Sequence, residues 1–489
     1  MQIKNGAIIF ALLLIAVGAS AADRFERFET RSLTFKGGRV SIDHSFGDIT
    51  LKTRTGSQLN FKATIRSSDP QFGQKIVISV VESASGIAIR TIYPDSKPNH
   101  TSIRINGASY SSYSVDYDIT IPETAPLTLR NKFGSTDVTG LRAPGEIVNA
   151  HGGVMFRDAR GAQRIENQFA GIDVANVSGD TTVQNANGSV VAKDIRGNLQ
   201  VTNRFAGVDV QRVAKNLIVR NANGAVSARD VDGAASITSS FATIEASTID
   251  GGLEVMNNNG SVDVHDIKGK TSIRNSFAPV KVSDIGGELT VTSQNSQVEA
   301  TKIGGPATIT SSFDQITVRD VGGVARIVNE NGNVTATDIR GDLNVDDRFG
   351  LVRAERINGN VDVDNTNGSV NIDNAHGNAK VRTSFASVFL KGVAGAIDVQ
   401  NQNGSISASG LSPNCHAVSL RTSFAGIKVS LPASPNYTID ARTSFGHITT
   451  EIPLTTTHAT DEMLSAKIGT GACRMDLQTS NGGVTIGRD

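Results

Sequence analysis

A 36-residue repeat runs through most of this 489-residue chain and restricts its fold more than any other feature. One position of the repeat holds phenylalanine, at Phe133, Phe169, Phe205, Phe241, Phe277, Phe313, Phe349 and Phe385. Midway between them the same position holds His151 and then asparagine, at Asn187, Asn223, Asn259, Asn295, Asn331, Asn367 and Asn403. The underlying unit is therefore half of this repeat, and sixteen successive copies of it keep one register.

Columns of β-branched residues run through both halves of the repeat, for example Ile165, Val183 and Val201. Such residues, spaced two apart with polar residues between them, form short strands with one buried face. One unit cannot bury that face alone, whereas stacked units bury it continuously. We therefore predict an all-β parallel β-solenoid of about sixteen 18-residue coils, arranged as a 36-residue double repeat. Stacked strands lie ~4.8 Å apart, which predicts a rod roughly 75–80 Å long.

A propeller with 36-residue blades and a chain of β-hairpins are the rival architectures. The strands of a propeller blade occupy different environments, so its two halves should not match column by column, as they do here. Asn-Gly suits a two-residue hairpin turn, but most of the alternate units have Phe-Ala or Phe-Gly there, which does not. Both observations favour the solenoid.

The flanking segments depart from the 18-residue register. Residues 23–128 contain alternating strand patterns such as FKATIRS and KIVISVVE, which predict an antiparallel β cap over the first coil. We expect residues 129–416 to form the regular solenoid. In residues 417–489 the unit lengthens, since SFAGIKV begins at Ser423 and SFGHITT only at Ser444, and we expect irregular coils and a C-terminal β cap there.

Residues 1–22 have the pattern of a secretory signal peptide. Lys4 precedes the apolar run AIIFALLLIAV, and Ala19 and Ala21 fit the small-residue cleavage rule. The run is too short to cross a bilayer as a helix, and we expect no transmembrane segment in the mature chain. The sequence therefore predicts export, to the periplasm or to the cell surface and medium.

Cys415 and Cys473 are the two cysteines of the chain. In an exported protein such a pair favours a disulfide, and two buried free thiols are the alternative. Two cysteines and eight scattered histidines supply no tetrahedral metal set, so we expect no metal and no cofactor.

The repeat positions have structural interpretations. We expect Phe to alternate with Asn because rings at every ~4.8 Å level would crowd. On this interpretation Asn187→Phe would overpack, and Phe205→Ala would open a cavity if the ring is buried. A second column, with Asn167, Asn185 and Asn203, is expected to stack amide on amide along the rod.

Recurring aspartates raise the question of calcium. Asp194, Asp230, Asp266 and Asp338 recur beside a turn, but the nonapeptide calcium motif is absent. We expect these side chains to bond to the backbone of their own turns. Zero formal charge, from 47 basic and 47 acidic residues, offers no case for a nucleic-acid partner. No coil carries a distinctive cluster of acids or bases, so we assign no catalytic residues.

The layout resembles the bacterial putative-adhesin family of exported β-solenoid domains, most of whose members have no known function. The resemblance is carried by YDITIPETAPLTLRNKFGSTDVTG (residues 117–140), the NGSV and SFA units, and SLRTSFAGIKVSLP near the C-terminus. It implies a non-catalytic, adhesin-like structural or interaction module of the cell envelope or surface, whose partner is an unidentified envelope or surface protein or glycan. Since many exported solenoids process glycans, a polysaccharide-binding or polysaccharide-cleaving solenoid is the alternative.

Overall fold

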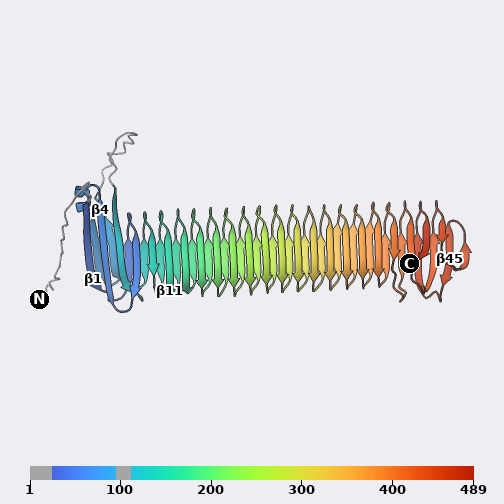
Figure 1. Ribbon diagram of the computed structural model, residues 1–489, viewed down its shortest axis with the longest axis horizontal. Helices are drawn as coiled ribbons and strands as arrows, with labels where there is room; N and C mark the ends of the chain where they lie inside the picture. Colours follow the sequence, from blue (N-terminus) through green and yellow to red (C-terminus); the bar gives the residue numbers. More distant parts are fainter. Residues whose placement is uncertain (1–24, 95–111) are drawn as a thin grey trace, which may run out of the picture.

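A computed structural model describes residues 25–94 and 112–489, and the described chain forms a straight rod of stacked β coils (Figure 1). The predicted signal peptide, residues 1–22, lies outside the described residues. The fold is a parallel β-solenoid of about 17 turns with antiparallel strands at the N-terminal end, which confirms the predicted fold class. The single helix of the described residues, α1 (Pro70–Lys75), is six residues long, and none there is suited to spanning a bilayer.

Each regular coil contains one short strand and one long strand, which belong to two different sheets. In the coil of Thr181–Gln184 (β14) and Val190–Ile195 (β15), Val183 pairs with Val201 of the next coil and Val190 pairs with Val208. Every such pairing joins equivalent positions of successive 18-residue units, and all are parallel. The fixed repeat length therefore places identical positions directly above one another.

The strands of the regular coils fall into two series. The short strands form one sheet: β8 (Leu127–Arg130), β10 (Gly145–Val148), β12 (Gln163–Glu166), β14, β16 (Leu199–Thr202), β18 (Leu217–Arg220), β20 (Ala235–Thr238), β22 (Leu253–Met256), β24 (Thr271–Arg274), β26 (Leu289–Thr292), β28 (Ala307–Thr310), β30 (Ala325–Val328), β32 (Leu343–Asp347), β34 (Val361–Asn365), β36 (Ala379–Thr383), β38 (Ile397–Gln400) and β40 (Val418–Arg421). The long strands form the other: β9 (Thr136–Thr139), β11 (Val154–Arg160), β13 (Ile172–Ser178), β15, β17 (Val208–Val213), β19 (Val226–Val231), β21 (Ile244–Ile249), β23 (Val262–Ile267), β25 (Val280–Ile285), β27 (Val298–Ile303), β29 (Ile316–Val321), β31 (Val334–Ile339), β33 (Val352–Ile357), β35 (Val370–Ala375), β37 (Val388–Val393), β39 (Ile406–Ser409) and β41 (Ile427–Leu431).

The β-branched columns form the core between the two sheets, as predicted. Val183, Val190 and Ala192 of one coil are fully buried, and Ile195 is 1% exposed. Glycines allow the coils to approach closely at both edges. A Cβ on Gly197 would lie 2.3 Å from the carbonyl group of Gly179, and one on Gly188 would lie 2.1 Å from that of Ala170. These glycines are therefore required by the stacking of coils.

At the N-terminal end the chain forms a cap and one displaced coil. The antiparallel part contains β1 (Phe25–Thr34), β4 (Gln58–Ser67) and β7 (Tyr113–Pro122) in one sheet, and β5 (Val77–Ser83) with β6 (Gly86–Ile92) in the other. The first coil, β2 (Arg39–Asp43) and β3 (Ile49–Arg54), lies between the later strands β6 and β7 on one side and β8 and β9 on the other. Spatial order and chain order therefore differ here.

The C-terminal end repeats this displacement. The last strands, β46 (Cys473–Gln478) and β47 (Val484–Arg488), pair with β40 and β41 on one side. On the other side they pair with β42 (Tyr437–Arg442) and β43 (Ile448–Thr450), which precede them in the chain. The far end of the rod carries the antiparallel strands β45 (Met463–Ile468) and β44 (Thr455–Ala459). The outermost element is thus this hairpin, while the chain terminus returns into the stack (Figure 1).

Candidate interaction surface

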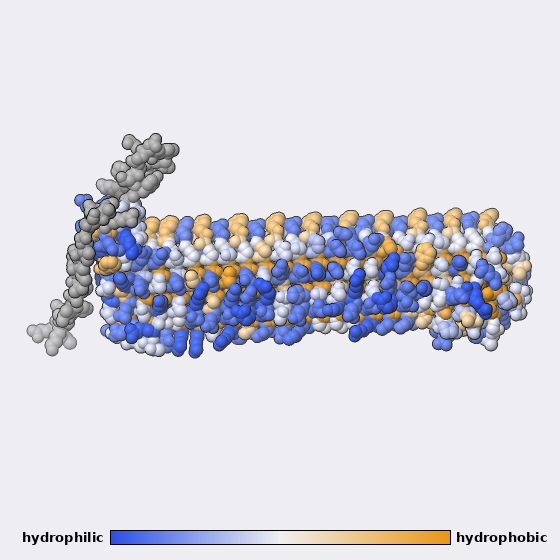
Figure 2. All heavy atoms as spheres, viewed as in Figure 1, coloured by the Kyte–Doolittle hydropathy of each residue, from blue (hydrophilic) through white to orange (hydrophobic). Residues whose placement is uncertain are grey.

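The Phe and Asn positions of the repeat lie in the turn between the short and the long strand of each coil. Because coils stack in register, these residues form one straight row along an edge of the rod. Figure 2 shows this as apolar and polar residues alternating along the upper edge. We call this row the aromatic ladder. Its rings are Phe46, Phe133, His151, Phe169, Phe205, Phe241, Phe277, Phe313, Phe349, Phe385, Phe424 and Phe445.

The rings of the aromatic ladder are outside the core. From Phe169 to Phe445 their exposed fractions range from 49% at Phe313 to 78% at Phe445. Phe133 and Phe46 are half-buried near the N-terminal cap. The condition attached to Phe205→Ala is therefore not met, because Phe205 is 55% exposed and its removal leaves no internal cavity.

The N-terminal rungs show that rings at consecutive levels do not crowd. Phe46 stacks on Phe133 at 5.0 Å between ring centroids, Phe133 on His151 at 4.5 Å, and His151 on Phe169 at 4.5 Å. The planes are within 8° of parallel. The prediction that Asn187→Phe would overpack is wrong, because flat rings facing along the rod fit the strand spacing.

The asparagine rungs connect each coil to its neighbour. Asn187 Nδ2 donates to the carbonyl of Gln168 at 2.8 Å, and Asn403 Nδ2 does the same to Ser384 at 3.0 Å. Asn223 and Asn259 make equivalent bonds to Arg204 and Ser240. These four asparagines therefore satisfy a turn carbonyl in the preceding phenylalanine coil.

The alternation of Phe and Asn survives the change of chain order at the C-terminal end. In sequence Phe424 is followed by Phe445 and only then by Asn481. In space Asn481 lies between them, because its backbone N–H donates to Ser423 and the N–H of Phe445 donates to Ser480. The same bonds join successive rungs of the regular array, for example Asn187 to Gln168. The order Phe, Asn, Phe is thus a property of the folded rod rather than of the repeated sequence.

A buried polar column lies directly beneath the aromatic ladder. Asn185 Nδ2 donates to the carbonyl of Ala170 in the preceding turn at 3.0 Å and to that of Gly188 in its own turn at 2.8 Å. Its Oδ1 accepts from the N–H of Ala186. Asn167 makes the corresponding bonds to Gly152 and Ala170. These amides join successive turns through backbone carbonyls, so the predicted amide-to-amide stacking is wrong. Asp347 occupies one level of this column, where burial raises its pKa to about 6.

The recurring aspartates occupy the opposite corner of each coil, where the long strand bends. Asp194, Asp230, Asp266 and Asp338 all have positive φ, between 57° and 60°. Asp and Asn tolerate this left-handed conformation better than most residues. The Asp194 carboxylate accepts from Arg212 Nε at 2.6 Å and Nη2 at 2.9 Å, and this bonding lowers its pKa. Asp338 pairs with Arg356 in the same way. The side chains of these two aspartates thus bond to the next coil, not to their own turns as predicted.

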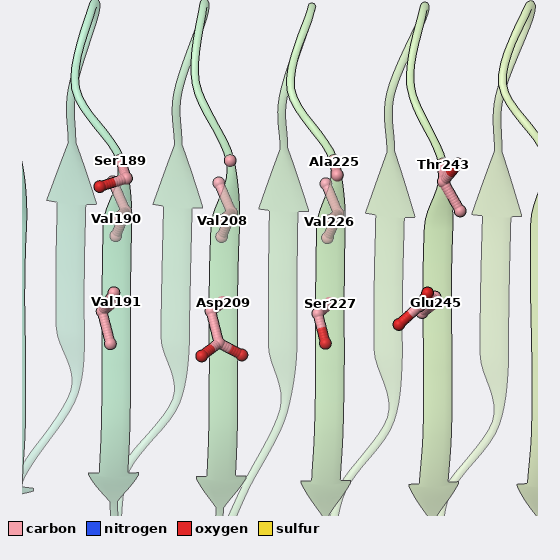
Figure 3. A pocket seen from close by; sticks show the side chains of 11 residues that line it. Ser189, Val190, Val191, Val208, Asp209, Ala225, Val226, Ser227, Thr243 and Glu245 are labelled. Carbon is pink, nitrogen blue, oxygen red and sulfur yellow. The ribbon is translucent and has the colours of Figure 1, made fainter.

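Within the described residues, no three His, Cys, Asp or Glu side chains are grouped so as to hold a metal ion. Figure 3 shows a shallow groove on the outer face of the long strands, where Val191, Asp209, Ser227 and Glu245 lie in register on β15, β17, β19 and β21. No histidine or cysteine lines this groove, so it contains no nucleophile paired with an imidazole base.

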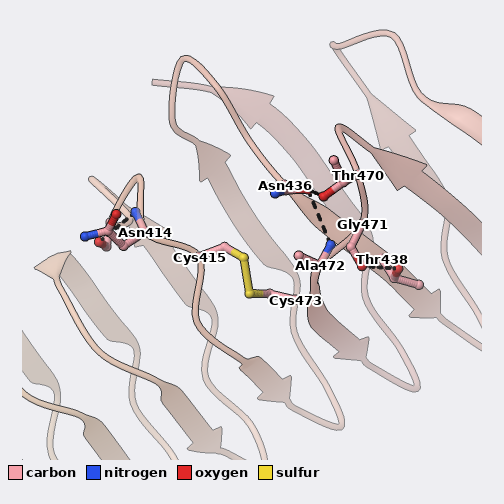
Figure 4. Close-up of a disulfide and its surroundings, with 9 residues drawn as sticks. Asn414, Cys415, Asn436, Thr438, Thr470, Gly471, Ala472 and Cys473 are labelled. Atoms are coloured by element: carbon pink, nitrogen blue, oxygen red, sulfur yellow. Dashed lines mark hydrogen bonds between the residues drawn. A yellow bond between two sulfur atoms is a disulfide. The ribbon is translucent and has the colours of Figure 1, made fainter.

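Cys415 and Cys473 are joined by a disulfide with a Cα–Cα distance of 5.8 Å (Figure 4). Cys415 lies in the loop between β39 and β40, and Cys473 begins β46. Next to it, Asn436 Oδ1 accepts from the hydroxyl of Thr470 at 2.6 Å and from the N–H of Ala472 at 3.3 Å. The bridge therefore attaches the displaced last coil to the end of the regular array.

Part of the chain is similar to a known family. The family model described as Toastrack DUF4097 matches residues 287–487. The resemblance to an adhesin-like β-solenoid family is confirmed for this segment. The matched segment begins in the turn before β26 and ends in β47. It includes the C-terminal part of the aromatic ladder, the disulfide and the C-terminal cap.

Among proteins of curated function, none matches this sequence. A solved structure similar to this chain is the crystal structure of a putative cell adhesion protein from Clostridium sporogenes ATCC 15579. The two chains are 10% identical, with a TM-score of 0.20, and the alignment covers 42% of this chain and 99% of the other.

Sequence reasoning located the regular ladder positions but missed their exposure, and it did not place Phe46, Phe424 and Phe445 in the same row. Phe46, Phe424 and Phe445 lie outside the regular 36-residue spacing. A signal for exposure was present, because the column alternates Phe with Asn and contains His151. A core column would have to fit a large ring and a much smaller amide at alternate levels, whereas a surface column tolerates both.

Proposed function

We propose that the protein is a non-catalytic, exported, adhesin-like interaction module, and that the aromatic ladder is the surface through which it binds a partner in the cell envelope or at the cell surface. The observation that carries the proposal is the straight row of half-exposed rings from Phe169 to Phe445. Asparagines separate the rings, but the rings share one straight edge, and a concentration of exposed apolar side chains on one edge marks an interaction site.

The placement of the rings supports a role in binding. A ring at the edge of a coil gains less from burial than one in the core, so folding alone does not require phenylalanine there. Leu, Val and Ile residues already fill the interior of each coil. The ladder therefore represents apolar area that the chain keeps available for contact.

Two further features support the proposal. The leader-like residues 1–22 support export. The absence of any distinct acid–base cluster from the sequence of the coils supports a non-catalytic role. Aromatic side chains with few rotatable bonds also supply contact area at low entropic cost.

The test is crosslinking in the native cell with a photoreactive residue at Asn259, between Phe241 and Phe277. We expect specific crosslinks to an envelope or surface component, and their loss when Phe241, Phe277 and Phe313 are replaced by Asn. Asparagine already occupies alternate levels of the row, so the triple variant should retain the fold. Phe389→Asn is the matched control, since Phe389 is 50% exposed on the outer face of β37 and outside the ladder.

Crosslinks that persist in the triple variant, or that are equally lost in Phe389→Asn, would contradict the proposal. A purified protein that cleaves a polysaccharide would favour the alternative, a glycan-processing solenoid. Such cleavage should be screened with and without calcium.

A further inference from the structure

We propose that the partner of the aromatic ladder is a second copy of this chain, whose rings enter the slots between the rings of the first. This inference rests on the function proposed above and specifies the partner. Successive Phe rungs lie two strand spacings apart, roughly 9–10 Å. A flat ring midway between them would have stacking contacts with both.

The molecule contains an example of a filled slot. His151 occupies the level between Phe133 and Phe169 and stacks on both at 4.5 Å between centroids. Its plane is 8° from that of Phe133 and 3° from that of Phe169. The levels of Asn187, Asn223 and Asn259 hold an asparagine instead, whose amide bonds back to the preceding turn. Each of these levels thus leaves a slot of the width that one ring fills.

The ladder is complementary to itself. From Phe169 to Phe445 its rings and slots alternate with equal spacing, so a second ladder shifted by one coil presents a ring to every slot of this part. The alternation continues across the displaced C-terminal coil, where Asn481 separates Phe424 from Phe445. Without Asn481 between them, Phe424 and Phe445 would be rings at consecutive levels, and the alternation of rings and slots would end there. The alternation continues because β47 lies between β41 and β43.

The exposed apolar area of the rings is comparable with the area that a standard interface buries. The nine rings from Phe169 to Phe445 expose roughly 1,000 Å² per copy, given the size of a phenylalanine side chain and the exposed fractions. A standard protein interface buries about 800 Å² per partner. Charge does not oppose the contact, because the residues beside most rungs are Ala, Ser, Gly, Gln or Asn, as at Ala186, Ser240, Ser276 and Gln402.

Symmetry selects the antiparallel arrangement. In a parallel pair related by a two-fold axis along the rod, rings would lie at equal heights and meet ring against ring. A one-coil shift between parallel rods avoids this, but the two copies are then no longer related by a two-fold axis, which most soluble oligomers have. A two-fold axis perpendicular to the rod, placed between a Phe and an Asn level, can set a ring opposite each of the eight slots between Phe169 and Phe445. The structure therefore points to an antiparallel dimer joined along its upper edge as drawn in Figure 2.

The experiment is sedimentation equilibrium on the full mature chain and two kinds of ladder variant. We expect a reversible dimer for the natural chain and a dissociation constant at least tenfold larger when Phe241, Phe277 and Phe313 become Asn. The decisive variant fills slots instead, with Asn259→Phe and Asn295→Phe. This variant increases the apolar surface, but its new rings occupy two slots that rings of the second copy would enter, so it should also weaken the dimer. Stronger association of this variant would overturn the interdigitated arrangement in favour of unspecific apolar contact.

Spin labels at Arg196→Cys, on the opposite edge of an early coil, test the orientation. Antiparallel copies should place the two labels far apart along the rod, whereas a short intermolecular distance would overturn the antiparallel pairing. A natural chain that stays monomeric at high concentration would overturn the second copy as partner. In that case crosslinks from Asn259 to another envelope protein or to a glycan would still support the proposed function, so the two failures are distinguishable.

Discussion

The regular coils and the two ends of the rod solve the same stacking problem in different ways. In the array, chain order and spatial order coincide, and each coil contacts only the coil before and the coil after it. At both ends a coil is threaded between two others, as β2 and β3 are at the N-terminus and β46 and β47 are at the C-terminus. The ends also carry the α-helix, the antiparallel strands and the disulfide.

This difference shows what an open solenoid requires for stability. An array of identical coils could grow or fray one level at a time, because its energy is a sum of nearest-neighbour contacts. In a simple array the coil nearest a chain end would be paired on one side only, whereas the displaced coil is paired on both sides and cannot fray without breaking two sets of strand pairings. The antiparallel hairpins then cover the exposed strand edges that would otherwise pair with another molecule. The two ends therefore limit growth and fraying of the rod, while the side chains of the regular coils form most of its surface.

The largest expected effect comes from opening the disulfide at the C-terminal end. Cys415 and Cys473 are 58 residues apart, and closing a loop of that length is worth about 4 kcal/mol in the chain-entropy model. We expect Cys415→Ser with Cys473→Ser to lower the free energy of local unfolding around residues 437–488, while the central coils keep theirs. Hydrogen exchange followed by mass spectrometry measures both regions at once. Equal loss throughout the rod would mean that array and ends unfold as one unit.

The next effect is a pH dependence of the N-terminal cap. His44 is 2% exposed, bonds through Nδ1 to the hydroxyl of Thr91 at 2.8 Å, and burial lowers its pKa to about 4. The unfolded chain takes up this proton near pH 6.5 and the folded chain only near pH 4. The free energy of unfolding of the cap should therefore fall by about 2–3 kcal/mol as the pH falls from 6.5 to 4.

The substitution His44→Gln keeps a hydrogen-bonding side chain and removes the titration. We expect it to flatten the pH dependence of exchange in β2, β6 and β7. Exposed His265→Gln is the matched control and should leave the slope unchanged. A slope that persists in His44→Gln would assign the effect to another group.

A smaller effect of opposite sign is expected in the array. Asp347 is 2% exposed in the buried column where most coils have Asn, Ser or Thr, and one of its oxygens accepts from the N–H of Gly350 at 3.0 Å. Its pKa of about 6 lies above the ordinary 3.8, so the folded state holds the proton more tightly than the unfolded state. Stability around this coil should therefore decrease as the pH rises from about 4 to about 6.

Asp347→Asn should remove this slope and stabilise the coil at pH 7 by about 1–2 kcal/mol, because an amide can donate to the turn carbonyls as Asn365 does to Gly350. The converse change, Asn365→Asp, should destabilise its coil by a similar amount. Thermal melts and local exchange at pH 4 and pH 7 measure both. Loss of stability at pH 7 in Asp347→Asn would contradict the interpretation.

The smallest effect is expected at the exposed corner of the coils. The ion pair of Asp194 with Arg212 is about half exposed, and exposed pairs contribute little. We expect Asp194→Asn to leave the melting temperature within experimental error, since Asn also tolerates the φ of 57°. Asp194→Val should cost about 1 kcal/mol, because a β-branched residue resists this conformation. Equal melting temperatures for the two variants would show that the corner relaxes freely.

The sequence predicted much of the array because its physics is local and periodic. Val190 and Val208 are one coil period apart in the chain, and both are buried in register. The aromatic ladder was only partly predictable. Periodicity identifies the position of Phe205 but does not say whether its ring points into the core or into solvent. The ends were the least predictable, because nothing in the order of Phe424, Phe445 and Asn481 indicates that the last coil returns between two earlier ones.

The sequence by itself determined the coil length, the strands and the identity of the core, because an 18-residue repeat of β-branched residues can bury its apolar face only by stacking on itself. The tertiary structure alone decided that the rings of the ladder face solvent, that their alternation with asparagine continues through the C-terminal end, and that Cys415 meets Cys473 beside a displaced coil. These features depend on which strand edges pair across long stretches of chain. Such pairings depend on the energy of the whole rod. The residues that make them show no periodic pattern from which the pairing could be predicted.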